Sequence, residues 1–290
     1  MAKGNFIRSL RQLILLTILF MIAVGSYLTR ANSTSWEEPL WVTVYPIAAD
    51  KAGVTERYIN GLTRENFRAV ERFMASETKR YGVTIEQPVR IDIGLPISEQ
   101  PPAPPADDNT LRIALWSLSL RWWARQATKD QPGPTPNIRL FLVYHDPNAD
   151  VRLPHSLGLQ KGMLGVVHVF ADRQAQGENN FIIAHEMLHT LGASDKYTGH
   201  TNQPIYPIGY AEPDQIPLYP QINAEIMGGR IPISTEYSEI PRSLKYARVG
   251  PETALEIRWI ESMSSRPVAS VSSKKTRRSV AERRVSGLSN

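Results

Sequence analysis

Hydrophobic and polar positions along the chain repeat with two different periods. Stretches with the period of two that a strand requires are rich in branched and aromatic residues, whereas others repeat an apolar residue every three or four positions, as one face of a helix does. The predicted strands are 40–47, 89–94, 138–145 and 164–171, and the predicted helices are 63–81, 109–126, one beginning at Asn179 or Asn180, and 252–263. The elements up to residue 192 therefore follow the order β-α-β-α-β-β and end on a helix.

The segment after Gly192 differs from the rest, because it is rich in Pro and Tyr and shows little periodicity. We expect an α+β fold in which a mixed sheet packs on one central helix. The N-terminal subdomain would run to residue 192, and a loop-rich C-terminal subdomain would cover 193–263. Residues 30–39 are predicted to be a linker, 40–263 the folded domain, and 264–290, which are Ser-rich and basic, a disordered tail.

The N-terminal residues have the pattern of a membrane anchor. A basic segment, 1–12, precedes an apolar run over 13–29, and crossing a bilayer takes roughly 20 apolar residues. Since the basic residues come first, the N-terminus is expected in the cytoplasm and the remaining chain outside it, periplasmic or extracellular. This predicts a single-pass protein with the lipid bilayer as a partner. A cleaved signal peptide followed by secretion is the alternative, although the run lacks a small-x-small cleavage site.

Composition limits the available chemistry. The chain has 290 residues, of which 42% are hydrophobic and 21% charged, as in globular proteins with a sizeable core. It contains no Cys, so disulfides, thiolate ligands and a Cys nucleophile are excluded, and a metal must be held by His, Asp or Glu. The net charge of +5 comes largely from the C-terminal tail, so no nucleic-acid partner is expected.

The candidate chemistry lies in residues 181–195, FIIAHEMLHTLGASD. His185 and His189 are four residues apart, so on a helix their side chains share one face and can bind a single Zn²⁺ ion. Glu186 follows His185 and points about 100° further round the helix. Its carboxylate is then placed to act as a general base on a water beside the metal.

A catalytic zinc site requires a third protein ligand and an open position. Gly192 can end the helix in a left-handed conformation, after which the chain turns back under the metal. Asp195 is then the favoured third ligand, with His200, Glu212 and Glu225 as competing candidates.

The pattern H-E-x-x-H-x-x-G-x-x-D, from His185 to Asp195, resembles that of the metzincin metallopeptidases, in particular the branch in which Asp replaces the third His, as in snapalysin-type peptidases. With Tyr197 two residues after Asp195, the run is also similar to that of the immune-inhibitor-A-like peptidases. The close match covers about fifteen residues. The resemblance implies a zincin-like fold, Zn²⁺ as cofactor, and a peptide or protein substrate.

Two further features follow from this resemblance. In such domains the strand before the active-site helix is an antiparallel edge that pairs with extended substrate, and 164–171 would be that strand. The segment 224–229 resembles the Met-turn, a tight turn that places a Met, here Met227, beneath the zinc. Gly229 stands where many metzincins have a Tyr, and Tyr237 is the nearest later Tyr.

The sequence therefore predicts a membrane-anchored zinc metallopeptidase in which His185, His189 and Asp195 hold the metal and Glu186 is the catalytic base. The alternative is a catalytically inactive, membrane-tethered binding or scaffold module with a structural zinc. Glu186 argues against that alternative, because a structural site needs no base. The other His residues are interpreted as structural or solvent-facing: His145, His155 and His168.

Overall fold

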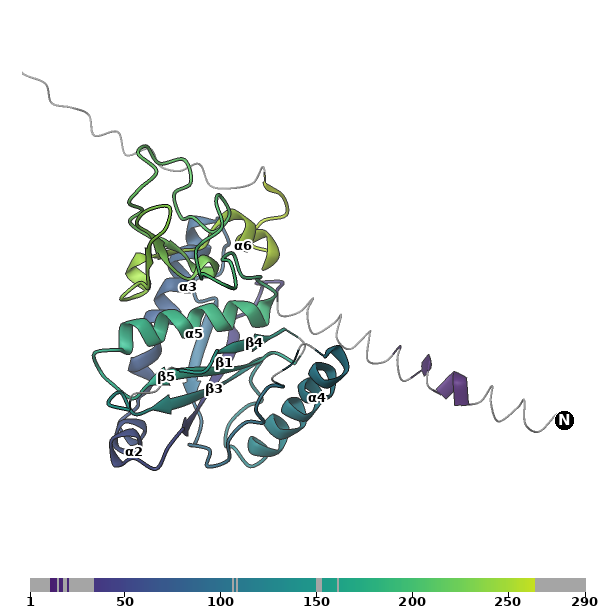
Figure 1. Cartoon of the computed structure of the whole chain (residues 1–290). Helices are drawn as coiled ribbons and strands as arrows, with labels where there is room; N and C mark the ends of the chain where they lie inside the picture. Colours follow the sequence, from purple (N-terminus) through teal and green to yellow (C-terminus); the bar gives the residue numbers. More distant parts are fainter. Residues whose placement is uncertain are drawn as a thin grey trace, which may run out of the picture.

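The centre of the fold is a mostly parallel five-stranded sheet with helices on both faces (Figure 1). The computed structural model describes residues 11–14, 16–17, 20, 34–105, 107, 109–149, 153–160 and 162–263. The sheet has the order β2-β1-β3-β5-β4. Its strands are β1 (Leu40–Ala48), β2 (Val89–Ile93), β3 (Ile138–His145), β4 (Leu157–Leu159) and β5 (Leu164–Phe170). All neighbours pair in parallel except β4, which runs antiparallel to β5 at one edge.

Alternate residues of β3 pack on opposite faces of the sheet, as the period of a strand requires. Leu140 and Leu142 lie in the larger core with α3 and α5, whereas Phe141 and Val143 pack with α4 on the other face. Burial on both faces explains why this strand is a continuous apolar run. The helices and 3₁₀ turns are α2 (Gly53–Asn60), η1 (Arg64–Phe67), α3 (Arg68–Arg80), α4 (Thr110–Ala127), α5 (Gln176–Leu191), η2 (Ile226–Gly228), η3 (Leu244–Tyr246) and α6 (Pro251–Glu256).

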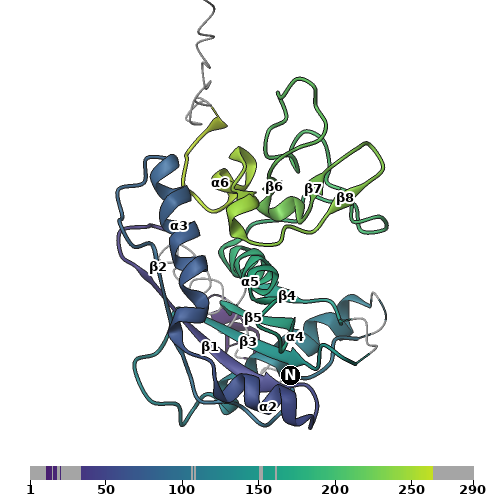
Figure 2. The same ribbon diagram turned by 90° about the vertical axis from the view of Figure 1, so that its left-hand side faces the viewer.

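The chain after α5 forms a loop-rich layer across α5, on the side away from the sheet (Figure 2). Its strands are short: β6 (Ala224–Glu225), β7 (Ile231–Pro232), β8 (Ser238–Glu239) and β9 (Ala247–Arg248). A buried carboxylate, Glu225, joins its parts by accepting hydrogen bonds from Gly228 N at 2.8 Å, Gly250 N at 2.9 Å and Thr253 Oγ1 at 2.7 Å. These three donors offset part of the cost of burying the charge, although burial still raises the pKa of Glu225, and they fix η2 against the start of α6.

The predicted mixed α/β architecture is confirmed, and the predicted strands match β1, β2, β3 and β5 to within one residue at either end. Two predictions about helix ends are wrong. Helix α5 begins at Gln176 rather than at an Asn cap, because Asn179 Nδ2 instead donates to Phe170 O at 2.9 Å and ties the helix to β5. Helix α6 ends at Glu256, well before residue 263.

The antiparallel edge strand is β4, not 164–171 as the resemblance implied. Strand β5 lies between β3 and β4 and is therefore paired along both sides. The sequence Leu-Gly-Leu of β4 is too short to show a period, so this strand could not be predicted from the hydrophobic pattern.

The N-terminal region corrects the prediction of a single-pass membrane protein with a cytoplasmic N-terminus. No helix in the described part of the chain is long and apolar enough to cross a bilayer, since a crossing takes roughly 20 apolar residues. Within 13–29 the described helical residues are 13–14, 16–17 and 20; the rest of that range, residues 1–10 and the predicted tail 264–290 lie outside the described residues. Trp36, in the predicted linker, is 6% exposed, and its Nε1 donates to Ile257 O at 2.8 Å.

Candidate metal centre

Helix α5 positions three of the predicted site residues: His185, Glu186 and His189. The helix packs between the sheet and the C-terminal layer and is buried along most of its length. It ends where predicted, at Gly192, which adopts the left-handed conformation with φ of 105° and donates its N–H to His189 O at 3.0 Å. A residue with a Cβ would be strained in this conformation.

Both imidazole rings are oriented by backbone carbonyls. His185 Nδ1 lies 2.9 Å from Ile226 O, and His189 Nδ1 lies 2.8 Å from Ala193 O. A carbonyl oxygen can only accept a hydrogen bond, so each Nδ1 carries a proton and donates it. In the neutral rings the lone pair is therefore on Nε2, the tautomer that a metal ligand requires.

The two Nε2 atoms converge with Asp195. They lie 3.1 Å from each other, and Asp195 Oδ1 lies 3.2 Å from His185 Nε2 and 3.1 Å from His189 Nε2. Tetrahedral coordination with bonds of about 2.0–2.1 Å would place neighbouring ligand atoms roughly 3.3 Å apart. The three side chains form a group that could hold a metal ion.

The electrostatics of the group fit a cation. Burial lowers the pKa of His185, but the hydrogen bond to Asp195 and the charge of Glu186 outweigh it and raise that pKa to about 8. Burial would raise the pKa of Asp195, yet its hydrogen bonds with His185 and His189 hold it well below its usual range. The two carboxylates thus favour a positive charge at this place, and a divalent cation that displaced the Nε2 protons would be stabilised by the same carboxylates.

Asp195 is held in place by its chain neighbours. Lys196 Nζ donates to Glu256 Oε2 at 2.7 Å, and Ser194 N donates to the same oxygen at 3.0 Å. Lys196 N also donates to Met227 O at 2.9 Å. The residues on either side of Asp195 are therefore tied to the end of α6 and to η2. The role of Glu256 could not be predicted from the sequence, because the contact joins segments 60 residues apart.

The competing third ligands lie elsewhere. Glu225 is fully buried, and its oxygens are engaged by three protein donors. Glu212 Oε1 accepts from Asn223 Nδ2 at 2.7 Å, and His200 is exposed. Among the described residues, the group formed with both His side chains contains Asp195 and none of these three.

Glu186 is buried but retains a free acceptor. It is 6% exposed, and among the described residues its Oε2 has no hydrogen-bond partner. Burial raises the pKa of its carboxyl, an effect that the charges of His185 and His189 oppose. A buried oxygen without a partner costs free energy, so it marks a position where a further polar group belongs.

Strand β4 lies directly against the metal-binding turn of α5. A Cβ atom added to Gly158 would lie 2.3 Å from Glu186 O and 2.6 Å from His189 Cβ. Only glycine allows this approach, which brings the free edge of β4 beside the site.

Turn η2, which contains Met227, lies at the site. Its Ile226 carbonyl orients His185, Met227 is fully buried, and Gly229 closes the turn with φ of 74°. Tyr237 is 55% exposed and donates to Glu239 Oε1 at 3.1 Å, so it does not serve the site. The aromatic residue near the metal group is Tyr197, whose ring centroid lies 6.3 Å from that of His185.

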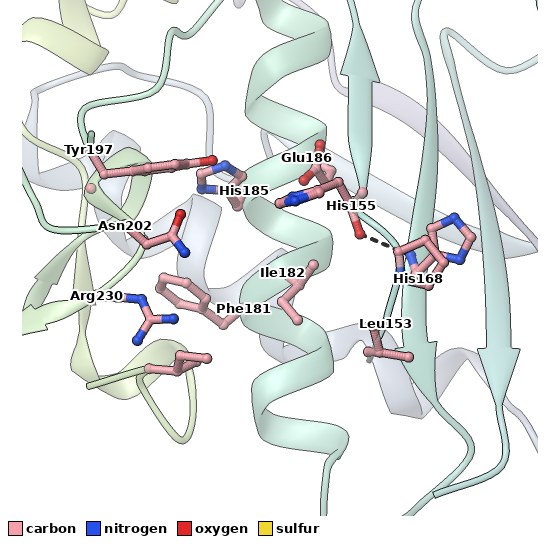
Figure 3. A pocket seen from close by; sticks show the side chains of 15 residues that line it. Leu153, His155, His168, Phe181, Ile182, His185, Glu186, Tyr197, Asn202 and Arg230 are labelled. Atoms are coloured by element: carbon pink, nitrogen blue, oxygen red, sulfur yellow. Dashed lines mark hydrogen bonds between the residues drawn. The ribbon is translucent and has the colours of Figure 1, made fainter. Parts of the chain in front are cut away.

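A pocket of about 250 Å³ opens in front of His185 and Glu186 (Figure 3). Two residues interpreted as structural or solvent-facing, His155 and His168, line it on the sheet side. His168 Nδ1 lies 2.9 Å from His145 Nε2, and burial together with the charge of His145 lowers the pKa of His168 to about 4. The sequence does contain one signal for His168 as a pocket residue, since it is a polar residue within the apolar run 164–171. The remaining lining comes from these residues: Leu153, Pro154, Ser156, Phe181, Ile182, Tyr197, Asn202, Gly228, Gly229, Arg230 and Ile240.

Comparisons with known proteins do not place the chain in a family. No family model and no curated protein matches it. Among solved structures, a chain from "Structure of a chaperone-substrate complex" is similar with a TM-score of 0.33 and 9% identity, over 79% of this chain and 35% of that one. The match thus spans about one third of that chain.

Proposed function

We propose that the protein is a zinc-dependent metallopeptidase whose metal is held by His185, His189 and Asp195. The observation that carries this proposal is the convergence of two Nε2 atoms and a carboxylate oxygen within 3.2 Å of one another, next to the unpartnered Oε2 of Glu186. A donor set of two His and one carboxylate, with no Cys in the chain, is typical of catalytic zinc.

Zinc in this site would supply a Lewis acid and increase the acidity of a neighbouring water. Glu186 is the general base that takes the proton of that water, and it later gives the proton to the leaving amine. The burial that raises the pKa of Glu186 favours its protonated form, which this second step requires. His185 and His189 are kept in the ligand tautomer by the carbonyls of Ile226 and Ala193.

The edge of β4 offers a place for extended substrate. Among the described strands, β4 pairs only with β5, so its other side can accept an antiparallel peptide. Gly158 brings this edge against Glu186 and His189. The same arrangement, together with turn η2 beneath His185, supports a metzincin-like interpretation of the site.

The test is zinc content and peptidase activity of the full chain, compared with Glu186→Gln. We expect one zinc per chain in both proteins, measured by mass spectrometry of the metal, and cleavage of casein or a peptide library only by the wild type. Equal cleavage by both would refute the role of Glu186. Zinc in both without cleavage by either would favour a structural zinc in a binding module, and a chain without zinc would refute the proposal.

A further inference from the structure

A cation faces the same pocket as Glu186. Arg230 comes from the C-terminal layer, immediately after the turn at Gly229. Figure 3 shows its guanidinium beside the ring of Phe181, on the side of α5 opposite His168. The pocket therefore has the metal-binding end at His185 and a positively charged side chain on another wall.

This guanidinium has little compensation from the protein. Among the described residues, it donates a long hydrogen bond of 3.5 Å from Nη1 to Ser238 O. Within the described part of the chain, no carboxylate oxygen lies within the 4.0 Å of an ion pair with Arg230. The charge of Arg230 opposes the rise in the pKa of Glu178 that burial causes. Glu178 lies two turns before His185 on α5, but it forms no ion pair with Arg230.

The surroundings strengthen an interaction with an anion. Arg230 is partly buried, and the pocket beside it is lined by the apolar side chains of Phe181, Ile182 and Ile240. Apolar walls lower the local dielectric constant, so a charge-assisted hydrogen bond is worth more there than in water. A guanidinium also matches a carboxylate with two parallel donors.

We propose that Arg230 binds a carboxylate of the substrate beside the bond that is cleaved, and so selects peptides that carry a carboxylate at that place. This inference rests on the proposed peptidase function, and it names the substrate class of that site. The carboxylate could belong to an acidic side chain or to the C-terminus of the substrate, since both offer the same two oxygens. The free C-terminus would make the enzyme a carboxypeptidase, whereas the side chain would make it an endopeptidase.

The experiment uses short internally quenched peptides in which Glu, Gln or Lys stands in turn at each position, with either a free or an amidated C-terminus. For the wild-type full chain, we expect kcat/KM for Glu next to the cleaved bond to exceed that for Gln by about 10- to 100-fold. A preference that depends instead on the free C-terminus identifies the terminal carboxylate as the ligand. Equal rates for Glu, Gln and both termini would overturn the inference.

Variants assign the preference to Arg230. Arg230→Gln should abolish the discrimination, and Arg230→Glu should turn it towards Lys. Lys245→Glu is the matched control, because Lys245 is exposed and outside the pocket and the charge change is the same. Unchanged discrimination in Arg230→Gln, with zinc content and circular dichroism like the wild type, would overturn the inference even if Arg230→Glu does not fold.

A binding measurement separates this inference from the proposed function. Glu186→Gln, loaded with zinc, should bind a fluorescent peptide with Glu or with a free C-terminus more tightly than the counterpart with Gln or an amidated C-terminus, and the double variant with Arg230→Gln should not. If no peptide is cleaved but this difference persists, the peptidase proposal fails and anion recognition stands. If peptides are cleaved but the difference is absent, the peptidase proposal stands and the role of Arg230 fails.

Discussion

The Nε2 atoms of His185 and His189 face each other at 3.1 Å while each Nδ1 is bonded to a backbone carbonyl. A ring that moved its proton from Nδ1 to Nε2 would lose its hydrogen bond to the backbone carbonyl. The carbonyls come from Ile226 in the C-terminal layer and Ala193 just after α5. The site therefore depends on the docking of two distant parts of the chain, not on the helix alone.

The first prediction concerns the metal ligands. His189→Ala should reduce zinc occupancy of the full chain to near zero under conditions where the wild type binds one ion, because a site with two remaining ligands is much weaker. His200→Ala should keep the wild-type occupancy, because His200 is exposed and outside the group. Undiminished zinc in His189→Ala, measured after dialysis against a weak chelator, would show that His189 is not a zinc ligand.

The second prediction concerns the contact between β4 and α5. Gly158→Ala introduces a Cβ 2.3 Å from Glu186 O, so β4 must move away from the site. Overpacking of this kind costs about 1–3 kcal/mol, and we expect activity to fall more than stability because the edge and Glu186 no longer align. Gly199→Ala is the control, since nothing lies within 4 Å of the added atom. Wild-type activity in Gly158→Ala would show that the close approach is not needed.

The sequence predicted most of the sheet and the site-bearing helix, because both have strong local signals. Burial of β3 on both faces produces a continuous apolar run, and α5 ends at a glycine. The H-E-x-x-H spacing places its side chains through helix geometry alone. Asp195 needed one further local step, the left-handed turn at Gly192.

What the sequence did not predict depends on contacts between distant segments. Arg230 and Glu256 reach the site from the C-terminal layer, whose path has no periodic pattern. Strand β4 has three residues, too few for a period. His155 and His168 line one pocket because the loop before β4 lies beside β5, a contact that the sequence pattern does not show.

The third prediction concerns the buried ion pair below Asp195. The Lys196 side chain is 2% exposed and lies 2.7 Å from Glu256, so Glu256→Gln leaves a buried ammonium without its counter-charge. Because Glu256 is itself 30% exposed, we expect a loss of about 3 kcal/mol in the free energy of unfolding, the lower end for breaking a buried pair. Zinc affinity should fall as well, since Ser194 and Lys196 position Asp195. Glu261→Gln, an exposed change, should have no effect in the same urea denaturation.

Acid should reduce the effect of this pair. Burial raises the pKa of Glu256, but the hydrogen bonds from Lys196 and Ser194 outweigh burial and lower it. A carboxyl whose folded pKa is depressed stabilises the fold above its unfolded pKa of about 4.3 and loses that contribution as pH falls through the folded pKa. The stability difference between wild type and Glu256→Gln should therefore be full at pH 7 and shrink below about pH 4. A difference independent of pH would show that the charge of Glu256 is not what stabilises the fold.

The fourth prediction concerns His168, whose lowered pKa also makes stability fall in acid, but over a higher pH range than for Glu256. Burial, with the charge of His145 adding to it, lowers the pKa of His168 to about 4 in the folded state, against about 6.5 in the unfolded chain. Between these values the unfolded state binds more protons, so stability is full above about pH 6.5 and falls as pH drops towards 4. We expect the wild type to lose roughly 1–3 kcal/mol between pH 7 and pH 5 from this group. Replacement by a residue that does not titrate, His168→Gln, should flatten that dependence, whereas His200→Gln should leave it unchanged. Equal slopes of unfolding free energy against pH in all three proteins would show that His168 is not buried in its neutral form.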